Sequence, residues 1–313
     1  MIEPLLKNIC EDISFPKVRG KITFNEPLSK ISWFQVGGNA EVFYEPADED
    51  DLIEFLSNLT LEAPVTVIGA TSNLLIRDGG IPGIVIRLGK SFNQLSIKED
   101  FVTIGASAKD MIVAKSLAKK NISGLEFLAG VPGTIGGSLA MNAGAYGSEM
   151  KDYVNSITGI DRTGKKHIIK GTELVMGYRK INLSKELIFT SANFSGFRRA
   201  DEDPFKLIKK ITQERRRTQP VSNPTGGSTF KNPPNKKAWK LIEQAGCRGL
   251  SVGGASISEM HCNFIINKSN ASAKDIEDLG NEVKERVFNS SGIRLFWEIK
   301  IMGINKKEKY KND

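Results

Sequence analysis

The chain has 313 residues, of which 40% are hydrophobic and 26% charged, and its formal net charge is +8. This length is large for a single hydrophobic core, so we expect two or more lobes. No apolar run approaches the roughly 20 residues that span a bilayer, and the N-terminal MIEPLLKNICEDISF lacks the sustained apolar segment of a secretory signal. These properties exclude a helical membrane protein and predict a globular, cytoplasmic protein without a membrane partner.

The cysteines and histidines favour no metal site. Cys10, Cys247 and Cys262 are odd in number and show no paired short spacing, so we expect free thiols in a reducing cytoplasm. The two histidines, His167 and His261, support neither a histidine-based metal site nor a Ser-His-Asp triad. We therefore expect no bound metal.

The positive net charge favours an anionic partner without naming it. The basic clusters are short: they lie at residues 165–166, at 215–217 and in the tail NKKEKYK. The sequence has no aromatic-interleaved RNA-binding pattern, paired Cys/His finger or basic heptad region. We therefore do not expect a nucleic-acid partner.

The first 90 residues predict strands with one clear helix. Residues 1–20 are expected to form a short helical lead-in, and residues 31–46 a strand, a glycine turn and a second strand. Residues 47–59 predict a helix, because acidic residues in its first turn complement the helix dipole. Residues 64–88 contain two apolar, strand-like runs, each followed by a glycine-containing loop.

Two hairpins and one helix are expected in the next part of the chain. FNQLSI and FVTIGA predict the first hairpin, and residues 154–170 predict the second around a Thr-Gly turn. Between them, Ser107 with Asp110 is expected to cap a helix over 108–121 in the S-x-x-D pattern. LIFTSANFSGF predicts a further strand, so residues 20–200 are closer to an α+β protein than to regular βαβ repeats.

The composition changes at residues 200–204, where we place the start of another lobe. Asp203 before Pro204 predicts the start of a helix, and AWKLIEQAG predicts a second helix. A longer helix is expected over 271–292, followed by a strand over 293–303. The apolar face of this longer helix consists of Ile276, Leu279, Val283 and Val287.

Two glycine-rich segments are candidates for phosphate binding. IGATSNLL starts at residue 68, and AGVPGTIGGSLAMNAG lies within residues 124–147, a stretch with seven glycines and a single charged residue, Glu126. Small side chains let consecutive main-chain amides approach a phosphate, and residues 134–142 could form a short helix there. Neither segment has the G-x-G-x-x-G or G-x-x-x-x-G-K-[ST] pattern, so tight packing is an equally good explanation from local chemistry alone.

Six ordered blocks over residues 20–303 reveal a resemblance. They are SWFQVGGNAE, VIGATSNLLIRDGG, residues 124–147, GYR at 177–179, GGSTFKNP at 226–233, and VGGASISEMHCNFIIN with the late FWEIKIMG. Together they resemble the bacterial flavoenzyme family of UDP-N-acetylenolpyruvoylglucosamine reductases, also called UDP-N-acetylmuramate dehydrogenases. The short segment after GYR is similar to the shorter subtype of that family.

The resemblance implies an α+β chain with vanillyl-alcohol-oxidase-like FAD-binding lobes and a smaller α/β substrate-binding lobe. We expect FAD-binding lobes at 1–85 and 86–200 and the substrate lobe at 201–313, with 293–313 returning towards the active site. The family's first loop is usually G-x-G-S-N, whereas Thr71 stands here in place of the second glycine. The implied FAD-binding residues are Gly69, Ala70, Thr71, Ser72, Asn73, Leu74, Pro132, Gly133, Thr134, Gly136, Gly137, Asn142, Ala143 and Gly144.

The reaction that the resemblance implies transfers a hydride from NADPH, through FAD, to the enolpyruvyl double bond of a UDP-sugar. Such an acceptor needs stabilisation of the charge that builds on its carboxylate, and an acid for the neighbouring carbon. Arg179 is implied to bind the carboxylate, Glu298 to donate a hydrogen bond to the developing enolate, and Ser228 to donate the proton. Without the resemblance, Arg179 reads as a surface residue, Glu298 as an outward-facing strand acid and Ser228 as part of a turn.

Further residues are implied in substrate binding. They are Tyr178, Lys231 and Asn232. Arg215 and Arg216 are explained more simply as part of a solvated helix face, and His261 as a structural histidine. We expect a monomeric enzyme of peptidoglycan precursor synthesis that takes a small UDP-sugar and NADPH. The alternatives are a related flavin oxidase of another substrate and a non-catalytic binder of UDP-sugars or nucleic acid.

Overall fold

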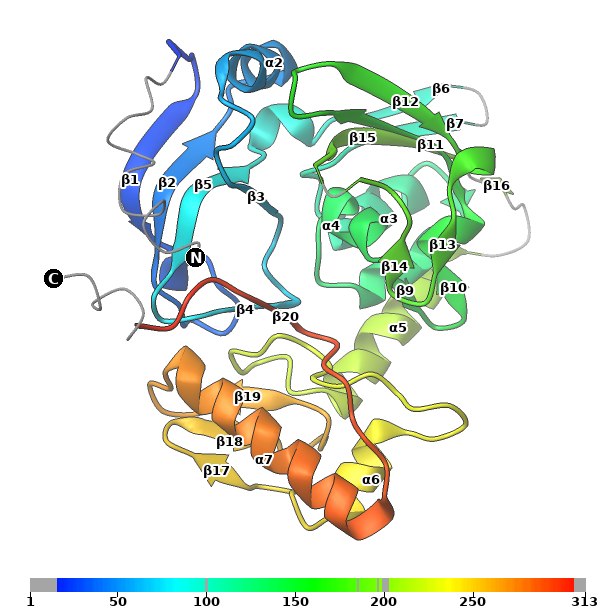
Figure 1. Cartoon of the computed structure of the whole chain (residues 1–313). Helices are drawn as coiled ribbons and strands as arrows, with labels where there is room; N and C mark the ends of the chain where they lie inside the picture. The colour runs from blue at the N-terminus through cyan, green and yellow to red at the C-terminus, as the bar shows by residue number, and fades with distance from the viewer. Residues whose placement is uncertain (1–15, 99–100, 185, 196, 199–202, 307–313) are drawn as a thin grey trace, which may run out of the picture. The chain divides into compact units, whose positions relative to one another are not determined.

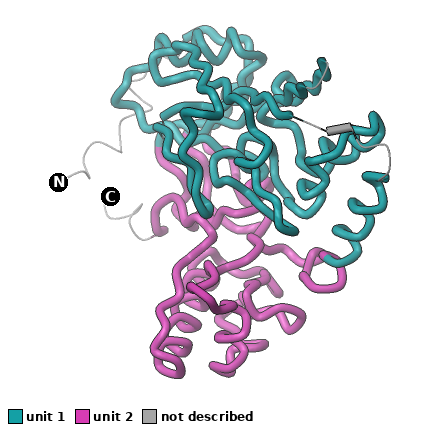
Figure 2. The backbone as a smooth tube through the Cα atoms, turned by 90° about the vertical axis from the view of Figure 1, so that its right-hand side faces the viewer, with its two compact units in different colours: residues 1–24, 42–70, 83–214 teal, residues 25–41, 71–82, 215–313 magenta. Residues whose placement is uncertain are grey.

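The computed structural model describes residues 16–98, 101–184, 186–195, 197–198 and 203–306. The chain forms two compact units (Figure 2). Unit 1 contains residues 1–24, 42–70 and 83–214, and unit 2 contains residues 25–41, 71–82 and 215–313. Cys10, the tail and most of the expected helical lead-in lie outside the described residues, and the expected three-lobe division stays a prediction.

A four-stranded sheet has the order β1-β2-β5-β3. Its strands are β1 (Lys21–Pro27), β2 (Asn39–Glu45), β3 (Val65–Ile68) and β5 (Ile81–Arg87). Helix α2 (Glu49–Asn58) confirms the predicted helix, and its first turn is capped by the side chain of Asp48. The strand predicted to begin at residue 31 is wrong: residues 31–38 form turns, because Gln35 and Gly37 have φ of 57° and 116° and break an extended path.

Unit 1 also contains a five-stranded antiparallel sheet in the order β12-β11-β15-β7-β6 (Figure 1). Both predicted hairpins and the predicted further strand are confirmed in it. Alternate residues of β15 are buried, as expected for a strand with one face against a core. The strands are β6 (Leu95–Lys98), β7 (Phe101–Gly105), β11 (Val154–Ile160), β12 (Lys166–Lys170) and β15 (Ile188–Ser195).

The glycine-rich stretch lies among short elements of unit 1, and its Phe127, Leu128, Ile135 and Leu139 join the buried core that includes residues of the five-stranded sheet. These elements are α3 (Asp110–Ala118), β8 (Ile122–Ser123), η3 (Glu126–Gly130), α4 (Ile135–Ala140), β9 (Gly144–Ala145), β10 (Ser148–Glu149), η4 (Met150–Asp152), η5 (Gly171–Glu173), β13 (Met176–Gly177), β14 (Lys180–Ile181) and β16 (Phe197–Arg198). Helix α5 (Pro204–Thr218) starts as predicted, where the Asp203 side chain accepts a hydrogen bond from the Phe205 amide.

The predicted cap of the helix after Ser107 is wrong. The Ser107 hydroxyl donates to the Gly89 carbonyl at 2.6 Å, and α3 begins only at Asp110 without a side-chain cap. Asp110 is itself buried and bonded to Ser138, so its carboxylate does not reach back to the start of the helix.

Unit 2 packs helices on a small sheet (Figure 1). Its elements are η1 (Leu28–Lys30), β4 (Leu74–Ile76), α6 (Ala238–Gln244), β17 (Ser251–Val252), β18 (Ala255–Ile257), β19 (Ile265–Asn267), α7 (Ala273–Ser291) and β20 (Lys300–Met302). Helix α7 runs between a Ser272–Asp275 capping box and Gly292. Its predicted apolar face is confirmed, because Ile276, Leu279, Val283 and Val287 have no exposed surface.

The last predicted strand is shorter than expected. Within residues 293–303, Trp297 makes an isolated bridge with Phe230, and Lys300–Met302 forms β20, which pairs parallel with β4. Residues 300–302 therefore lie beside β4, which directly follows the first glycine-containing loop. No helix in the described part of the chain is long and apolar enough to cross a membrane.

Candidate active site

The second glycine-rich loop is held by main-chain hydrogen bonds to residues 106–110 of unit 1. The Asp110 amide donates to the Gly133 carbonyl at 3.2 Å, and the Gly136 amide donates to the Ala106 carbonyl at 2.8 Å. A side chain at Gly136 would place its Cβ only 3.0 Å from the Cβ of Ala106, so glycine permits this close approach. The predicted short helix in the loop is confirmed as α4.

The two expected cofactor loops meet within unit 1. A Cβ at Gly69 would lie 2.7 Å from the Thr134 hydroxyl oxygen, so a larger residue at position 69 would force Thr134 away. Gly69, Gly133 and Thr134 are partly exposed, and Gly137 is exposed. The loops thus present main chain that an incoming group can reach, which fits the pyrophosphate of a dinucleotide cofactor.

A buried carboxyl lies directly behind the second loop. Asp110 has no exposed surface; its Oδ2 accepts a hydrogen bond from the Ser138 hydroxyl at 2.7 Å, and its buried Oδ1 has no hydrogen-bond partner. Burial raises the pKa of Asp110 to about 8, against smaller opposing effects of hydrogen bonds with Ser138 and Gly133. Sequence reasoning missed this role, although an acid at the start of an otherwise apolar helical segment is a usable signal.

Asn142 links the second loop to the GYR segment. Its side-chain amide donates to the Glu149 carboxylate at 2.9 Å and to the Gly177 carbonyl at 3.0 Å, and its oxygen accepts from the Lys151 amide. These partners are all protein groups, so the described role of this side chain is to hold the loop. Its neighbour Ala143 is buried as well.

Arg179 lies beside the end of the same loop in unit 1. Its guanidinium nitrogens approach the Gly144 carbonyl at 3.4 and 3.5 Å, and its Cζ is 5.4 Å from the centre of the Tyr178 ring. Its φ of 55° lies in the left-handed region, which is uncommon for a residue other than glycine. Tyr178 is 54% exposed, so both side chains of this expected pair lie at the surface of the unit.

The segments that carry Ser228 and Glu298 are paired in unit 2. The Glu298 amide donates to the carbonyl of Thr229 at 2.9 Å, and Thr229 is the residue after Ser228. Phe230 and Trp297 form the adjacent bridge, with ring centres 5.1 Å apart. Both expected catalytic side chains are partly exposed, so neither is sealed inside the core.

Part of the first expected cofactor loop lies at the same place. A Cβ at Gly227 would lie 3.7 Å from the Ser72 carbonyl oxygen, and the Asn73 side chain donates to the Glu298 carbonyl at 3.2 Å. Thr71 has φ of 60° and is buried, with its hydroxyl donating to the Ile31 carbonyl at 2.8 Å. The threonine that replaces the usual glycine therefore keeps a left-handed turn.

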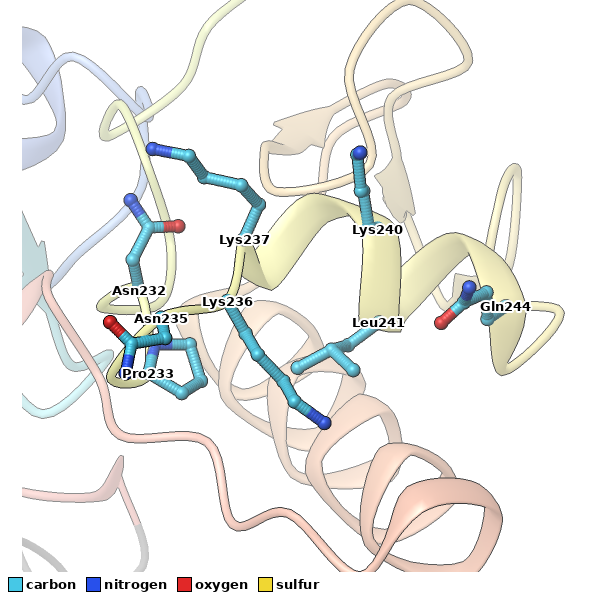
Figure 3. A pocket seen from close by; sticks show the side chains of 8 residues that line it. All are labelled: Asn232, Pro233, Asn235, Lys236, Lys237, Lys240, Leu241 and Gln244. Carbon is cyan, nitrogen blue, oxygen red and sulfur yellow. The ribbon is translucent and has the colours of Figure 1, made fainter.

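A lysine-rich pocket of about 610 Å³ is lined by residues that come after the turn of Ser228 in the sequence (Figure 3). The Asn232 side-chain oxygen accepts from the Ala238 amide at 2.9 Å, which fixes Asn232 at the start of α6. Lys231 is half-buried, and its amide pairs with the Phe296 carbonyl. The pocket is lined by Asn232, Pro233, Asn235, Lys236, Lys237, Lys240, Leu241 and Gln244.

His261 and Arg215, the remaining candidates, are bonded to neighbouring protein groups. His261 accepts a hydrogen bond at Nδ1 from the Asn263 amide and packs edge-on against Phe264, and burial lowers its pKa. Arg215, on α5, donates to the side chain of Gln219, the residue after that helix. Among the described residues, no group of His, Cys, Asp and Glu side chains is placed to hold a metal ion.

Known proteins resemble the chain over almost its whole length. Residues 219–302 match the family model of the UDP-N-acetylenolpyruvoylglucosamine reductase C-terminal domain, and residues 40–169 match an FAD binding domain. UDP-N-acetylenolpyruvoylglucosamine reductases of Parvibaculum lavamentivorans and Paramagnetospirillum magneticum are 49% and 50% identical, and each alignment covers 93% of this chain and 94% or 95% of the relative.

A solved structure agrees with these sequence matches. The UDP-N-acetylenolpyruvylglucosamine reductase from Thermus caldophilus is 32% identical with a TM-score of 0.80, and the match covers 92% of this chain and 100% of that one. The expected α+β flavoprotein fold is thereby confirmed. The chain belongs to the UDP-N-acetylenolpyruvoylglucosamine reductase family.

Proposed function

We propose that the chain reduces the enolpyruvyl group of UDP-N-acetylglucosamine enolpyruvate to UDP-N-acetylmuramate, with NADPH as reductant and FAD as bound cofactor. This reaction belongs to peptidoglycan precursor synthesis, and the family of the chain supports it. The observation that most supports the site is the Glu298–Thr229 main-chain hydrogen bond, because it pairs the segment of Glu298 with the segment that contains Ser228.

The proposed FAD-binding residues lie in the two glycine-rich loops. Gly69 and Thr134 bring the loops together, and Gly133 and Gly136 keep the main chain of the second loop close to residues 106–110. FAD, when bound, supplies the relay of a hydride from NADPH to the substrate.

Arg179, Glu298 and Ser228 divide the remaining chemistry. A hydride that adds to the methylene carbon of the enolpyruvyl group builds negative charge on the neighbouring carboxylate. The Arg179 guanidinium binds that carboxylate through its planar fork, and Glu298 donates a hydrogen bond to the developing enolate. Ser228 donates the proton to the carbon next to the carboxylate and, being partly exposed, regains a proton from solvent.

The lysine-rich pocket supports a nucleotide-sugar substrate. Its cationic side chains complement a diphosphate, and Asn232 connects it in sequence to the Ser228 turn. We assign Lys231 and Asn232 to this part of the substrate and Tyr178 to the part near Arg179. We further propose that the enzyme is a cytoplasmic monomer; the free, buried thiols of Cys247 and Cys262 support the reducing compartment.

The visible absorption spectrum of the purified protein tests this function. We expect a flavin spectrum that bleaches when NADPH is added without oxygen and returns when the enolpyruvyl UDP-sugar is added. Bleaching without return would contradict the proposed substrate. A colourless protein that takes up no added FAD would contradict the flavoenzyme.

A further inference from the structure

The main chain of Glu298 is held from two sides within unit 2. Its amide donates to the Thr229 carbonyl at 2.9 Å, and its carbonyl accepts a hydrogen bond from the Asn73 side-chain nitrogen at 3.2 Å. Both main-chain polar groups of Glu298 are therefore bonded. One partner neighbours Ser228, and the other lies in the first glycine-containing loop.

The Asn73 contact extends the pairing of β4 with β20. The Lys300 amide donates to the Asn73 carbonyl at 3.0 Å, and the parallel register then continues with Leu74 opposite Lys300. Beyond this point the main chain of the loop turns away from β20. At Glu298 the donor is therefore the Asn73 side-chain amide in place of a main-chain amide. A carboxamide N–H group can fill this place because it donates hydrogen bonds as a peptide amide does.

The loop that presents Asn73 is itself fixed in position. The buried Thr71 has a φ of 60°, which is costly for a β-branched residue, and its hydroxyl is bonded to the Ile31 carbonyl at 2.8 Å. The Leu74 amide donates back to the Thr71 carbonyl at 3.1 Å and closes the turn. Asn73 therefore contacts Glu298 from a loop whose conformation is fixed by these hydrogen bonds.

We propose that Asn73 is a positioning residue for Glu298, so that the side chain at this loop position serves the reduction of the substrate. The proposal rests on the proposed function, in which Glu298 contacts the enolpyruvyl carboxylate. The Asn73 hydrogen bond orients the 298–299 peptide, and the direction of that peptide sets where the Glu298 carboxyl lies. A misplacement of about 1 Å in such a group lowers a rate by roughly 100-fold.

Asn73→Ala and Asn73→Asp test the proposal in the FAD-loaded enzyme. Alanine removes the donor, and aspartate keeps the shape but faces the Glu298 carbonyl with an acceptor. With FAD supplied in excess to both variants, we expect the return of flavin absorbance with the substrate to be slowed roughly 10- to 100-fold more than bleaching by NADPH. Asn58→Ala is the matched control, because it removes an amide-to-carbonyl hydrogen bond on the surface of α2.

A second measurement does not depend on turnover. Hydrogen exchange of the Glu298 amide should be at least about tenfold faster in Asn73→Ala than in the wild type or Asn58→Ala, since the main chain of Glu298 loses one of the two hydrogen bonds that hold it. If the alanine variant does not fold, Asn73→Ser supplies the same comparison with a shorter polar side chain.

The outcomes separate this proposal from the function on which it rests. Slowing of bleaching and return by the same factor, with unchanged exchange at Glu298, would limit Asn73 to its role in the FAD-binding loop and overturn the proposal, as would unchanged rates with unchanged exchange. Failure of the wild-type spectrum to return with the enolpyruvyl UDP-sugar would instead refute the proposed substrate. The exchange difference at Glu298 would still report on the positioning contact.

Discussion

The hydroxyl of Ser138 donates a hydrogen bond to the carboxyl of Asp110, with 2.7 Å between the oxygens, at a position where Asp110 has no exposed surface. The second carboxyl oxygen is buried without a partner. Because a buried carboxylate without a cation is costly, the pKa of Asp110 rises to about 8 and the neutral acid predominates at pH 7. A neutral Asp110 therefore supports the second glycine-rich loop.

Asp110→Asn should flatten the pH dependence of stability between about pH 4 and pH 8. The folded-state pKa of Asp110 lies above its unfolded value, so the folded protein binds the extra proton in this range. Stability from this group is complete below about pH 4 and is lost as the pH rises towards 8, at no more than about 1.4 kcal/mol per pH unit. Urea unfolding at several pH values measures the slope.

The exposed Asp50→Asn serves as the control for this series. It removes a carboxylate from the surface of α2 and should leave the slope of the wild type in place. An Asp110→Asn protein with the wild-type slope would show that Asp110 is not the titrating group.

Regular elements were predictable from the sequence where one local signal dominated. The acidic start of α2, the Asp203–Pro204 start of α5 and the apolar face of α7 each depend on neighbours within a few residues. The predicted strand from residue 31 failed because the left-handed residues Gln35 and Gly37 turn the chain there. Glutamine is not one of the common turn residues, so the sequence did not indicate a turn at Gln35.

Contacts distant in sequence account for what was missed at the site. The Ser107 cap failed because the hydroxyl bonds to Gly89, and the Asp110 carboxyl bonds to Ser138, which is 28 residues away. The pairing of Asn73 with Glu298 spans 225 residues. No local pattern encodes such pairs, so the resemblance could name candidate site residues but not the hydrogen bonds around them.

Ser228→Ala should separate the two halves of the reaction. Because the hydroxyl is assigned to protonate the substrate, bleaching of the flavin by NADPH should be unchanged while turnover falls roughly 100-fold or more. Stopped-flow absorbance measures both rates, and Ser290→Ala on the surface of α7 is the control. Full turnover by Ser228→Ala would remove this residue from the mechanism.

Arg179→Lys should keep the positive charge at this position but lose the two-point binding of the substrate carboxylate. A lysine ammonium does not reproduce the planar fork that binds a carboxylate in two places. We expect retained flavin and turnover lowered roughly 100- to 1,000-fold, as for loss of one charge-stabilising donor. Steady-state kinetics with the enolpyruvyl UDP-sugar test this, with Arg286→Lys, an exposed ion-paired arginine of α7, as the matched control. An Arg179→Lys enzyme with wild-type kcat would show that charge alone suffices.

Gly280→Ala should destabilise the protein although alanine is the better helix former. Replacing a mid-helix glycine by alanine usually stabilises a helix by about 1 kcal/mol. Here the new Cβ would collide with the indole ring of Trp297, which packs on α7 at Gly280 and forms the bridge with Phe230. We therefore expect the melting temperature to fall, with turnover falling as well because Trp297 precedes Glu298.

The double variant Gly280→Ala with Trp297→Leu isolates the cause of this effect. Leucine removes the ring that the new Cβ would meet, so adding Gly280→Ala to Trp297→Leu should cost little stability or should increase it. Thermal unfolding of the wild type, both single variants and the double variant gives the coupling free energy between the two positions. Equal destabilisation by Gly280→Ala in both backgrounds would show that the glycine is needed for a reason other than the indole. A large favourable coupling would establish that α7 sets the position of Trp297, and through it the segment that carries Glu298.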